Sequence, residues 1–297
     1  MLMVQETPDH RRSFQPTALR FWMACGSRRV PEGVTAETMT RGREDPTSWT
    51  SYLTAFHQDR PGITEEILGV STSAAQNPYE WLVEAIPSDA NLLDLACGSA
   101  PLLRAGWKGP WIGVDRSAAE VDRARTNGAR NVVAAEANDL PFEDHQFSAL
   151  TCSMALMLID PLDDCLAEIA RVLTPGGTIA LLLPGGPSTL FPTDIWRWGT
   201  VLIALRRLRL RYPNDRSIRR LRATADRHHM VVITDDRRRF TYQVATTDAA
   251  DRFLDSLYLP NIETARTDAA RRVARKWIGS SIGIPLRRVR LCLDTAG

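Results

Sequence analysis

The sequence lacks any pattern for a metal centre or a disulfide framework. Its cysteines are odd in number, far apart and free of C-x-x-C pairs, so neither disulfides nor a zinc site is predicted. The adjacent His228 and His229 have no third ligand at metal spacing, and we expect no metal. Free thiols suit a reducing compartment, so we expect the cytoplasm. The five cysteines are Cys25, Cys97, Cys152, Cys165 and Cys292.

Long apolar runs and net charge are also missing. The longest apolar runs, Met154–Ile159 and Val201–Leu205, are far shorter than the ~18 residues of a membrane span, and the N-terminus has no apolar secretory segment. Lysine and arginine number 37 against 35 aspartates and glutamates, which gives no global attraction to nucleic acid or to an anionic membrane. We therefore expect neither as a partner. Only Lys108 and Lys276 are lysines, so arginine clusters first reflect a general arginine bias.

The chain length of 297 residues predicts one α/β domain with additions. Residues 1–45 mix Arg, Thr, Pro and Gly without periodicity and are expected to be a disordered leader. Residues 46–90 predict helices, the first with apolar residues one turn apart from Trp49 onward. Thr64, followed by two glutamates, favours the start of a second helix, and a third is expected over 78–86.

Strands and helices then alternate through residues 91–297, as in a parallel α/β sheet. Between the fifth and sixth strands, residues 187–228 predict an arginine-rich helical insertion with Trp196 on its inner side. Residues 206–239 hold twelve arginines and four aspartates. Because arginine is overused throughout the chain, we interpret this segment as a solvated face with local ion pairs rather than as a phosphate-binding surface. Strands are predicted at 92–95, 111–115, 132–135, 147–153, 178–183, 231–234 and 289–293, and 240–245 is interpreted as a hairpin arm or edge strand.

The turn after the first strand suits a ligand. The buried strand Leu92–Leu95 runs into small residues at Ala96, Gly98 and Ala100, where backbone can approach a ligand closely and the N–H groups of the next helix favour polar groups. Asp94, just ahead of the turn, would repel the pyrophosphate of a dinucleotide. The same carboxylate would attract a cationic ligand.

The run Asp94-x-Ala96-Cys97-Gly98-x-Ala100 resembles motif I of class I S-adenosylmethionine-dependent methyltransferases, which places glycines at alternate positions after an acid. The resemblance implies that Asp94, Ala96, Cys97 and Gly98 line a site for S-adenosylmethionine. Of the alternate positions only Gly98 is glycine, and we expect a negative φ at Ala100.

Further motifs follow in the family's order through residues 81–184. The family has an acid at the end of the second strand that holds the ribose hydroxyls, and the resemblance assigns this role to Asp115, beside Arg116. Ser153 ends the fourth strand at the same edge of the sheet and is included in the implied cofactor site. The segment after the third strand resembles the family's adenine-binding segment and consists of Glu136, Ala137 and Asn138.

The resemblance implies a Rossmann-like, seven-stranded, mostly parallel sheet with helices on both faces, an antiparallel last strand and an N-terminal helical lid over 46–90. It also implies methyl transfer to a small molecule, and an apolar or aromatic acceptor is expected if the run Met154–Leu158 lines a pocket rather than only packing. His57 and Tyr52 are candidates for contact with this acceptor. Two alternatives stay open: an RNA methyltransferase that uses the arginine-rich insertion, and a cofactor-binding protein without catalysis.

Overall fold

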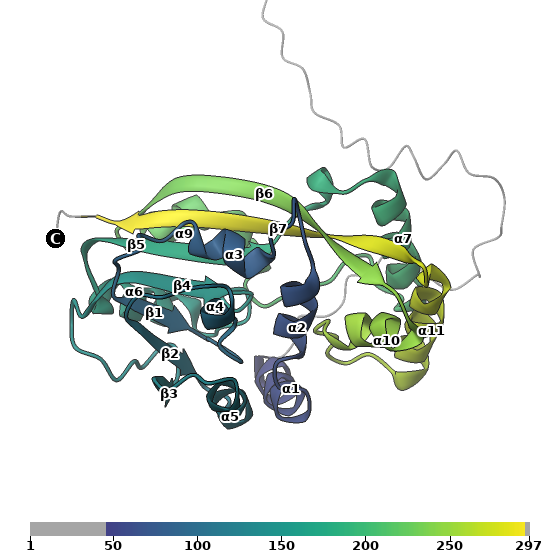
Figure 1. Ribbon diagram of the computed structural model, residues 1–297, viewed down its shortest axis with the longest axis horizontal. Coiled ribbons are helices and arrows are strands. Elements are labelled where there is room, and N and C mark those ends of the chain that lie inside the picture. The colour runs from purple at the N-terminus through teal and green to yellow at the C-terminus, as the bar shows by residue number, and fades with distance from the viewer. Residues whose placement is uncertain (1–45, 295–297) are drawn as a thin grey trace, which may run out of the picture. The chain divides into compact units, whose positions relative to one another are not determined.

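The structure, a computed structural model, describes residues 46–294, so the expected leader over 1–45 lies outside the described residues. These residues belong to one compact unit, built on a seven-stranded sheet in the order β3-β2-β1-β4-β5-β7-β6 (Figure 1). The strands are β1 (Leu92–Leu95), β2 (Trp111–Asp115), β3 (Val132–Ala134), β4 (Phe147–Ser153), β5 (Leu173–Pro184), β6 (Met230–Val244) and β7 (Ser280–Leu293).

Five neighbouring strands are parallel. β1 pairs with β2 and β4, β2 with β3, and β4 with β5, all in the same direction. β7 lies between β5 and β6 and is antiparallel to both. The Rossmann-like sheet with an antiparallel last strand is therefore confirmed.

β6 is longer than the sequence suggested. The segments expected at 231–234 and 240–245 belong to one strand that pairs with β7 along its length. The charged residues between them remain in the strand because β7 offers partners: Asp235 accepts a hydrogen bond from Arg287 at 2.8 Å, and Asp236 accepts one from Arg288 at 3.3 Å. Cross-strand ion pairs thus hold the charged residues between the two expected segments in the strand.

Helices cover both faces of the sheet. On β1, Leu92 packs with residues of α3, α4 and α5, whereas Leu93 packs with residues of α1 and α6. Successive strand residues point to opposite faces, so the central strands are buried on both sides, as parallel sheets usually are. The helices are α1 (Pro46–Asp59), α2 (Ile63–Val70), α3 (Pro78–Val83), α4 (Pro101–Arg104), α5 (Ala118–Thr126), α6 (Leu162–Val172), α7 (Pro192–Ala204), α8 (Asp215–Arg219), α9 (Leu221–Asp226), α10 (Thr247–Asp255) and α11 (Thr264–Ala274).

The three N-terminal helices form as predicted, except at one cap. α1 buries an apolar stripe that ends at Phe56. α2 has no side-chain cap at Thr64; it follows Gly62, whose φ of +81° turns the chain sharply after α1. α3 begins with a capping box, in which the Asn77 side chain accepts from the Glu80 N–H at 3.0 Å and the Glu80 carboxylate accepts from the Asn77 N–H at 2.7 Å.

The insertion over 187–228 contains α7, α8 and α9. The prediction that Trp196 faces inward is wrong, because its side chain is 65 % exposed. Trp198 takes the inner position instead: its indole N–H donates to the Gly283 carbonyl at 2.9 Å, and its ring lies 5.4 Å from that of Phe253. Among residues 46–294, no helix combines the length and apolar character needed to cross a bilayer.

Candidate functional site

One cavity collects nearly all of the predicted site residues. It encloses about 120 Å³ where β1, β2 and β4 end, and it is also lined by residues of α1, α2 and α3. Tyr52 is not among the lining residues; its hydroxyl accepts a hydrogen bond from the Leu259 N–H at 2.8 Å. The predicted residues that do line the cavity are His57, Asp94, Ala96, Cys97, Gly98, Asp115, Arg116, Glu136, Ala137, Asn138 and Ser153.

The turn between β1 and α4 has left-handed backbone at every second residue. Ala96, Gly98 and Ala100 have φ values of +52°, +49° and +58°. The expected negative φ at Ala100 is therefore wrong, because the chain repeats the same sharp bend there although the residue is alanine. Glycine is required at 98 for a further reason: a Cβ atom there would overlap the carboxylate of Glu65.

Asp115 ties the two sides of the turn together. Its Oδ2 accepts from the Gly98 N–H at 2.9 Å, and its Oδ1 accepts from the Ser117 N–H at 2.9 Å. Burial raises the pKa of this carboxyl, although the two backbone hydrogen bonds oppose the shift. The remaining lone pairs can accept further donors in the cavity, which suits a pair of hydroxyls.

Asp94 is almost fully buried at the floor of the same turn. Its Oδ1 accepts from the Thr151 hydroxyl at 2.7 Å, while Oδ2 has no hydrogen-bond partner within residues 46–294. Burial raises the pKa of this carboxyl to about 7, although Thr151 and the nearby Trp111 indole lower it. A cation in the cavity would stabilise the charged form.

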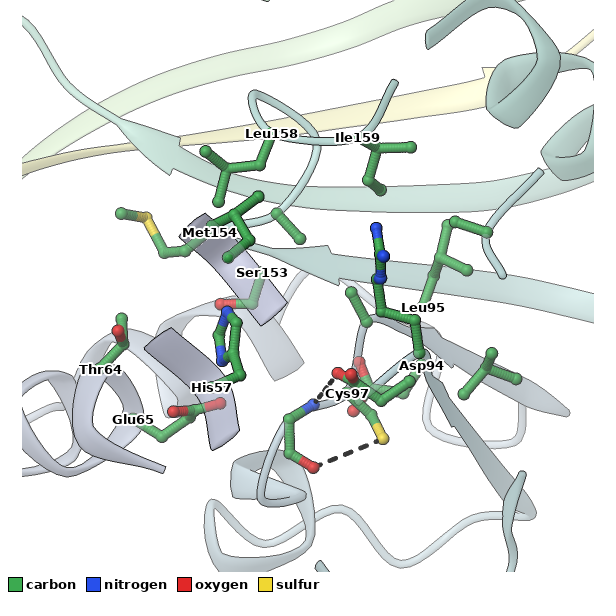
Figure 2. Close-up of a pocket in the computed structure, with 18 of the residues that line it drawn as sticks. His57, Thr64, Glu65, Asp94, Leu95, Cys97, Ser153, Met154, Leu158 and Ile159 are labelled. Atoms are coloured by element: carbon green, nitrogen blue, oxygen red, sulfur yellow. Dashed lines mark hydrogen bonds between the residues drawn. The ribbon is translucent and has the colours of Figure 1, made fainter. Parts of the chain in front are cut away.

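Glu65 reaches the cavity from α2 and lies over Gly98. Burial raises its pKa to about 7, and the negative charge of Glu120 adds to the shift. The Glu65 backbone N–H donates a hydrogen bond to this carboxylate and lowers its pKa. No other residue between 46 and 294 donates a hydrogen bond to it. Figure 2 shows it directed into the cavity below His57.

His57 is held by a buried partner. Its Nδ1 lies 2.8 Å from Oε1 of Glu120, which also accepts from the Gly62 N–H at 3.1 Å. Burial opposes a charged imidazole, but the hydrogen bond and the charges of Glu120, Asp115 and Glu65 outweigh it and raise the pKa of His57. The ring is therefore oriented by Glu120.

The predicted adenine segment lies at the open side of the cavity. Glu136 has an exposed side chain whose Oε1 lies 3.6 Å from Nε of Arg116. Ala137 and Asn138 line the cavity beside it. In the part of the chain that the structure describes, no group of three potential metal-ligating side chains comes together.

The other end of the cavity is apolar. Met154, Ala155, Leu158 and Ile159 line it (Figure 2), whereas Leu156, between them in sequence, is fully buried in the core. The two interpretations of this run therefore both hold, because alternate parts of one loop line the cavity and pack beneath it.

A single residue of the insertion fixes this apolar wall. Asn214 donates from its backbone N–H to the Met157 carbonyl at 3.1 Å. Its side-chain amide donates to the carbonyls of Leu156 at 3.1 Å and Ile159 at 2.6 Å. Three hydrogen bonds from one asparagine thus fasten the insertion to the cavity loop.

Known methyltransferases match this part of the sequence. A family model described as a methyltransferase domain matches residues 93–181. The chain is 36 % identical over 113 residues to a demethylmenaquinone methyltransferase of Staphylococcus saprophyticus, covering 35 % of this chain and 48 % of that protein. It is 38 % identical over 110 residues to a 2-phytyl-1,4-naphtoquinone methyltransferase of Synechococcus elongatus, covering 33 % and 47 %.

By these matches the chain is similar to the class I S-adenosylmethionine-dependent methyltransferases, and residues 93–181 match their methyltransferase domain. It spans about half the length of the curated relatives it matches. Among solved structures, the [4+2]-cyclase SpnF has the same fold, with a TM-score of 0.52 and 17 % identity over 84 % of this chain and 97 % of that one. This likeness concerns the fold alone.

S-adenosylmethionine is the cofactor of this methyltransferase family, and the cavity residues fit it. The cofactor carries a sulfonium and an ammonium, and the lining contains five carboxylates, two of them almost fully buried, against His57 and Arg116. Asp115 presents a carboxylate that can take two ribose hydroxyls. The five carboxylates belong to Glu65, Asp94, Asp115, Glu136 and Asp160.

Two acids of this site were missed as site residues in the sequence. Glu65 looked like an ordinary first-turn acid that favours the α2 dipole, and Glu120 looked like part of the polar face of α5. In the structure Glu120 is only 1 % exposed, because α1 covers that face and supplies His57. No sequence pattern signals this contact, since the two residues come from separate helices.

Proposed function

We propose that this chain transfers the methyl group of S-adenosylmethionine to an apolar, aromatic small molecule. The observation that carries the proposal is the division of one cavity into an acidic part, with Glu65, Asp94 and Asp115, and an apolar part, with Met154 and Leu158. A cationic methyl donor fits the first part, and an apolar acceptor fits the second.

Four of the acidic residues have a proposed role toward the cofactor. Asp115 accepts from the ribose hydroxyls, and Glu136 accepts from the adenine amino group at the open side. Glu65 binds the ammonium of the amino-acid end, because its carboxylate lies over the Gly98 turn without another residue as donor. Asp94 adds negative charge beneath the same turn.

S-adenosylmethionine supplies an electrophilic methyl group when bound. The residues of the chain then act by positioning and by excluding water, the competing nucleophile. The wall of Met154, Leu158 and Ile159 holds the acceptor ring. His57, oriented through Nδ1 by Glu120, presents Nε2 toward the acceptor and can hold or release a proton there.

The acceptor class is proposed from the apolar wall and from the relatives. Two relatives are named for demethylmenaquinone and for 2-phytyl-1,4-naphthoquinone, which are quinones. The arginines of 206–239 give less support to RNA, because several are already paired within the fold, such as Arg239 with Asp194 at 2.7 Å and Arg227 with Asp163 at 2.9 Å.

The proposal is tested in two steps. Calorimetry first measures binding of S-adenosylhomocysteine and of NAD to the full chain, and we expect binding of the first only. Transfer of labelled methyl groups is then measured on a panel of naphthoquinols, phenols, nucleosides and RNA. Activity on the nucleosides or RNA alone would contradict the acceptor class, and binding without transfer to any acceptor would support the non-catalytic alternative.

A matched variant separates the two parts of the cavity. Ala155→Phe fills space at the apolar end and changes none of the acidic residues of the lining. We expect S-adenosylhomocysteine affinity to stay within about threefold and methyl transfer to fall by about tenfold or more. Equal loss of both would place the acceptor elsewhere.

A further inference from the structure

Helix α7 turns its two charged residues inward beside buried Val201, and exposes a second face that is apolar. Phe191, at the N-cap, and Ile195, Gly199 and Ile203 recur every four residues and so share one face, with Trp196 beside them. The large apolar side chains of this face, Phe191, Ile195, Trp196 and Ile203, are between 50 and 65 % exposed. A helix on the surface of a globular protein normally shows the reverse arrangement.

The two charged residues of α7 both point into the protein. Asp194 is completely buried, pairs with Arg239 at 2.7 Å and accepts from the Gly283 N–H at 2.7 Å. Arg197 donates to the Ser281 carbonyl. Because these bonds fix the rotation of the helix against β6 and β7, the apolar face cannot turn inward without breaking them.

Basic residues continue directly from the apolar face. After α7 the chain reads Arg206-Arg207-Leu208-Arg209, and Leu208 is 70 % exposed. Within the described range, no carboxylate forms an ion pair with Arg206 or Arg207, whereas Arg209 lies 3.8 Å from Asp215. An exposed apolar stripe with tryptophan beside unpaired arginines is the composition of a helix that lies in the interface of an anionic bilayer.

We propose that α7 and residues 206–209 dock this chain on an anionic lipid surface, with the α7 face inserted among the acyl chains and the arginines on the head groups. The charge decides between occupants. An anionic bilayer satisfies the apolar face and the arginines together, whereas a second copy of this chain covers the apolar face but brings a second set of arginines.

The test is sedimentation of the full chain with vesicles of phosphatidylcholine alone or with about 30 % phosphatidylglycerol. We expect binding to the anionic vesicles only, weakened by salt. Arg206→Gln with Arg207→Gln should weaken it about 30-fold at low salt. Trp196→Ser with Ile203→Ser should weaken it about tenfold or more at any salt concentration.

Val231→Ser with Ile233→Ser is the matched control, because these β6 side chains are also nearly half exposed but lie outside α7. We expect it to bind vesicles like the unmodified chain. Equal binding to neutral and anionic vesicles, equal loss in the control, or no binding would overturn the proposal.

Two further measurements identify other occupants. A dimer in lipid-free solution that Trp196→Ser with Ile203→Ser dissociates would assign the face to a second copy and overturn the lipid proposal. The second measurement labels the Ile203→Cys variant with maleimide in the free monomer and detects the label by peptide mass spectrometry. Resistance to labelling would assign the α7 face to another segment of the same chain. The proposal expects a labelled monomer.

Discussion

Substitution of Glu65 by glutamine tests the cofactor site most directly. The change removes a charge and keeps the size of the side chain that lies over Gly98. We expect S-adenosylhomocysteine, which carries the ammonium, to bind more weakly by about 1.5–3 kcal/mol, the range for a hydrogen bond to a charged group. This corresponds to a rise in Kd of about 10- to 150-fold.

The neighbouring acid provides the control for this experiment. Glu66 forms ion pairs with Arg123 and Arg252 and is about one-third exposed. Exposed pairs contribute little, so Glu66→Gln should change the Kd by less than about threefold. Methylthioadenosine, which lacks the amino-acid end of the cofactor, is the second control, and its Kd should be the same for the unmodified chain and for Glu65→Gln.

The pH dependence of S-adenosylhomocysteine affinity gives a third measurement by the same calorimetry. The pKa of Glu65 is raised to about 7 by burial, so its charge, and with it part of the affinity, should be lost as the pH falls through about 7 in the unmodified chain. Glu65→Gln should flatten that part of the profile. The reasoning is refuted if Glu65→Gln binds S-adenosylhomocysteine normally, or if both ligands lose affinity equally. Absence of S-adenosylhomocysteine binding to the unmodified chain would instead refute the proposed function.

Three further variants test the turn. The pKa of Asp94 is about 7 in the folded chain against 3.8 as the ordinary value. Without ligand, the free energy of unfolding should therefore fall by on the order of 2 kcal/mol between about pH 5.5 and about pH 7.5 because of this group. Asp94→Asn should remove that fall, as measured by urea titration. Asp115→Ala should weaken S-adenosylhomocysteine by about 1.5–3 kcal/mol and lower the Tm, because two backbone N–H groups lose their acceptor; an unchanged Kd would move the ribose site. Ala100→Gly should raise stability by about 1 kcal/mol, measured in urea, because φ is +58°, and a loss would contradict backbone strain there.

The strand order was predictable because each central strand is an apolar run bounded by turn residues. Leu92–Leu95 and Phe147–Ser153 match their strands residue for residue, since both faces of a parallel sheet are buried and tolerate few polar side chains. Asp94 and Asp115 were predicted for the site because the turn after the first strand and the acid at the end of the second resemble the motifs of class I methyltransferases. The structure brings both to one cavity, while their roles in binding stay predictions.

Features that depend on a partner far away in sequence were not predictable. The segments 231–234 and 240–245 were predicted separately, because the charges at 235–239 are accommodated in a strand only by Arg287 and Arg288 of β7. Trp196 looked like a core residue because aromatic side chains usually are, but buried Asp194 and Arg239 set the rotation of α7. Glu65 could be recognised only once α2 was placed over Gly98.

Asn214 connects the insertion to the loop that lines the apolar end of the cavity, so changes in the insertion can change that end during evolution. Its three hydrogen bonds to the loop 156–159 mean that the wall of the apolar end is positioned both by the sheet and by the insertion that follows β5. The acids at the turn depend on no residue of that segment. Exchange or reshaping of residues 187–228 would therefore change the apolar end, which is the proposed acceptor site, and leave the hydrogen bonds of the acidic turn as they are.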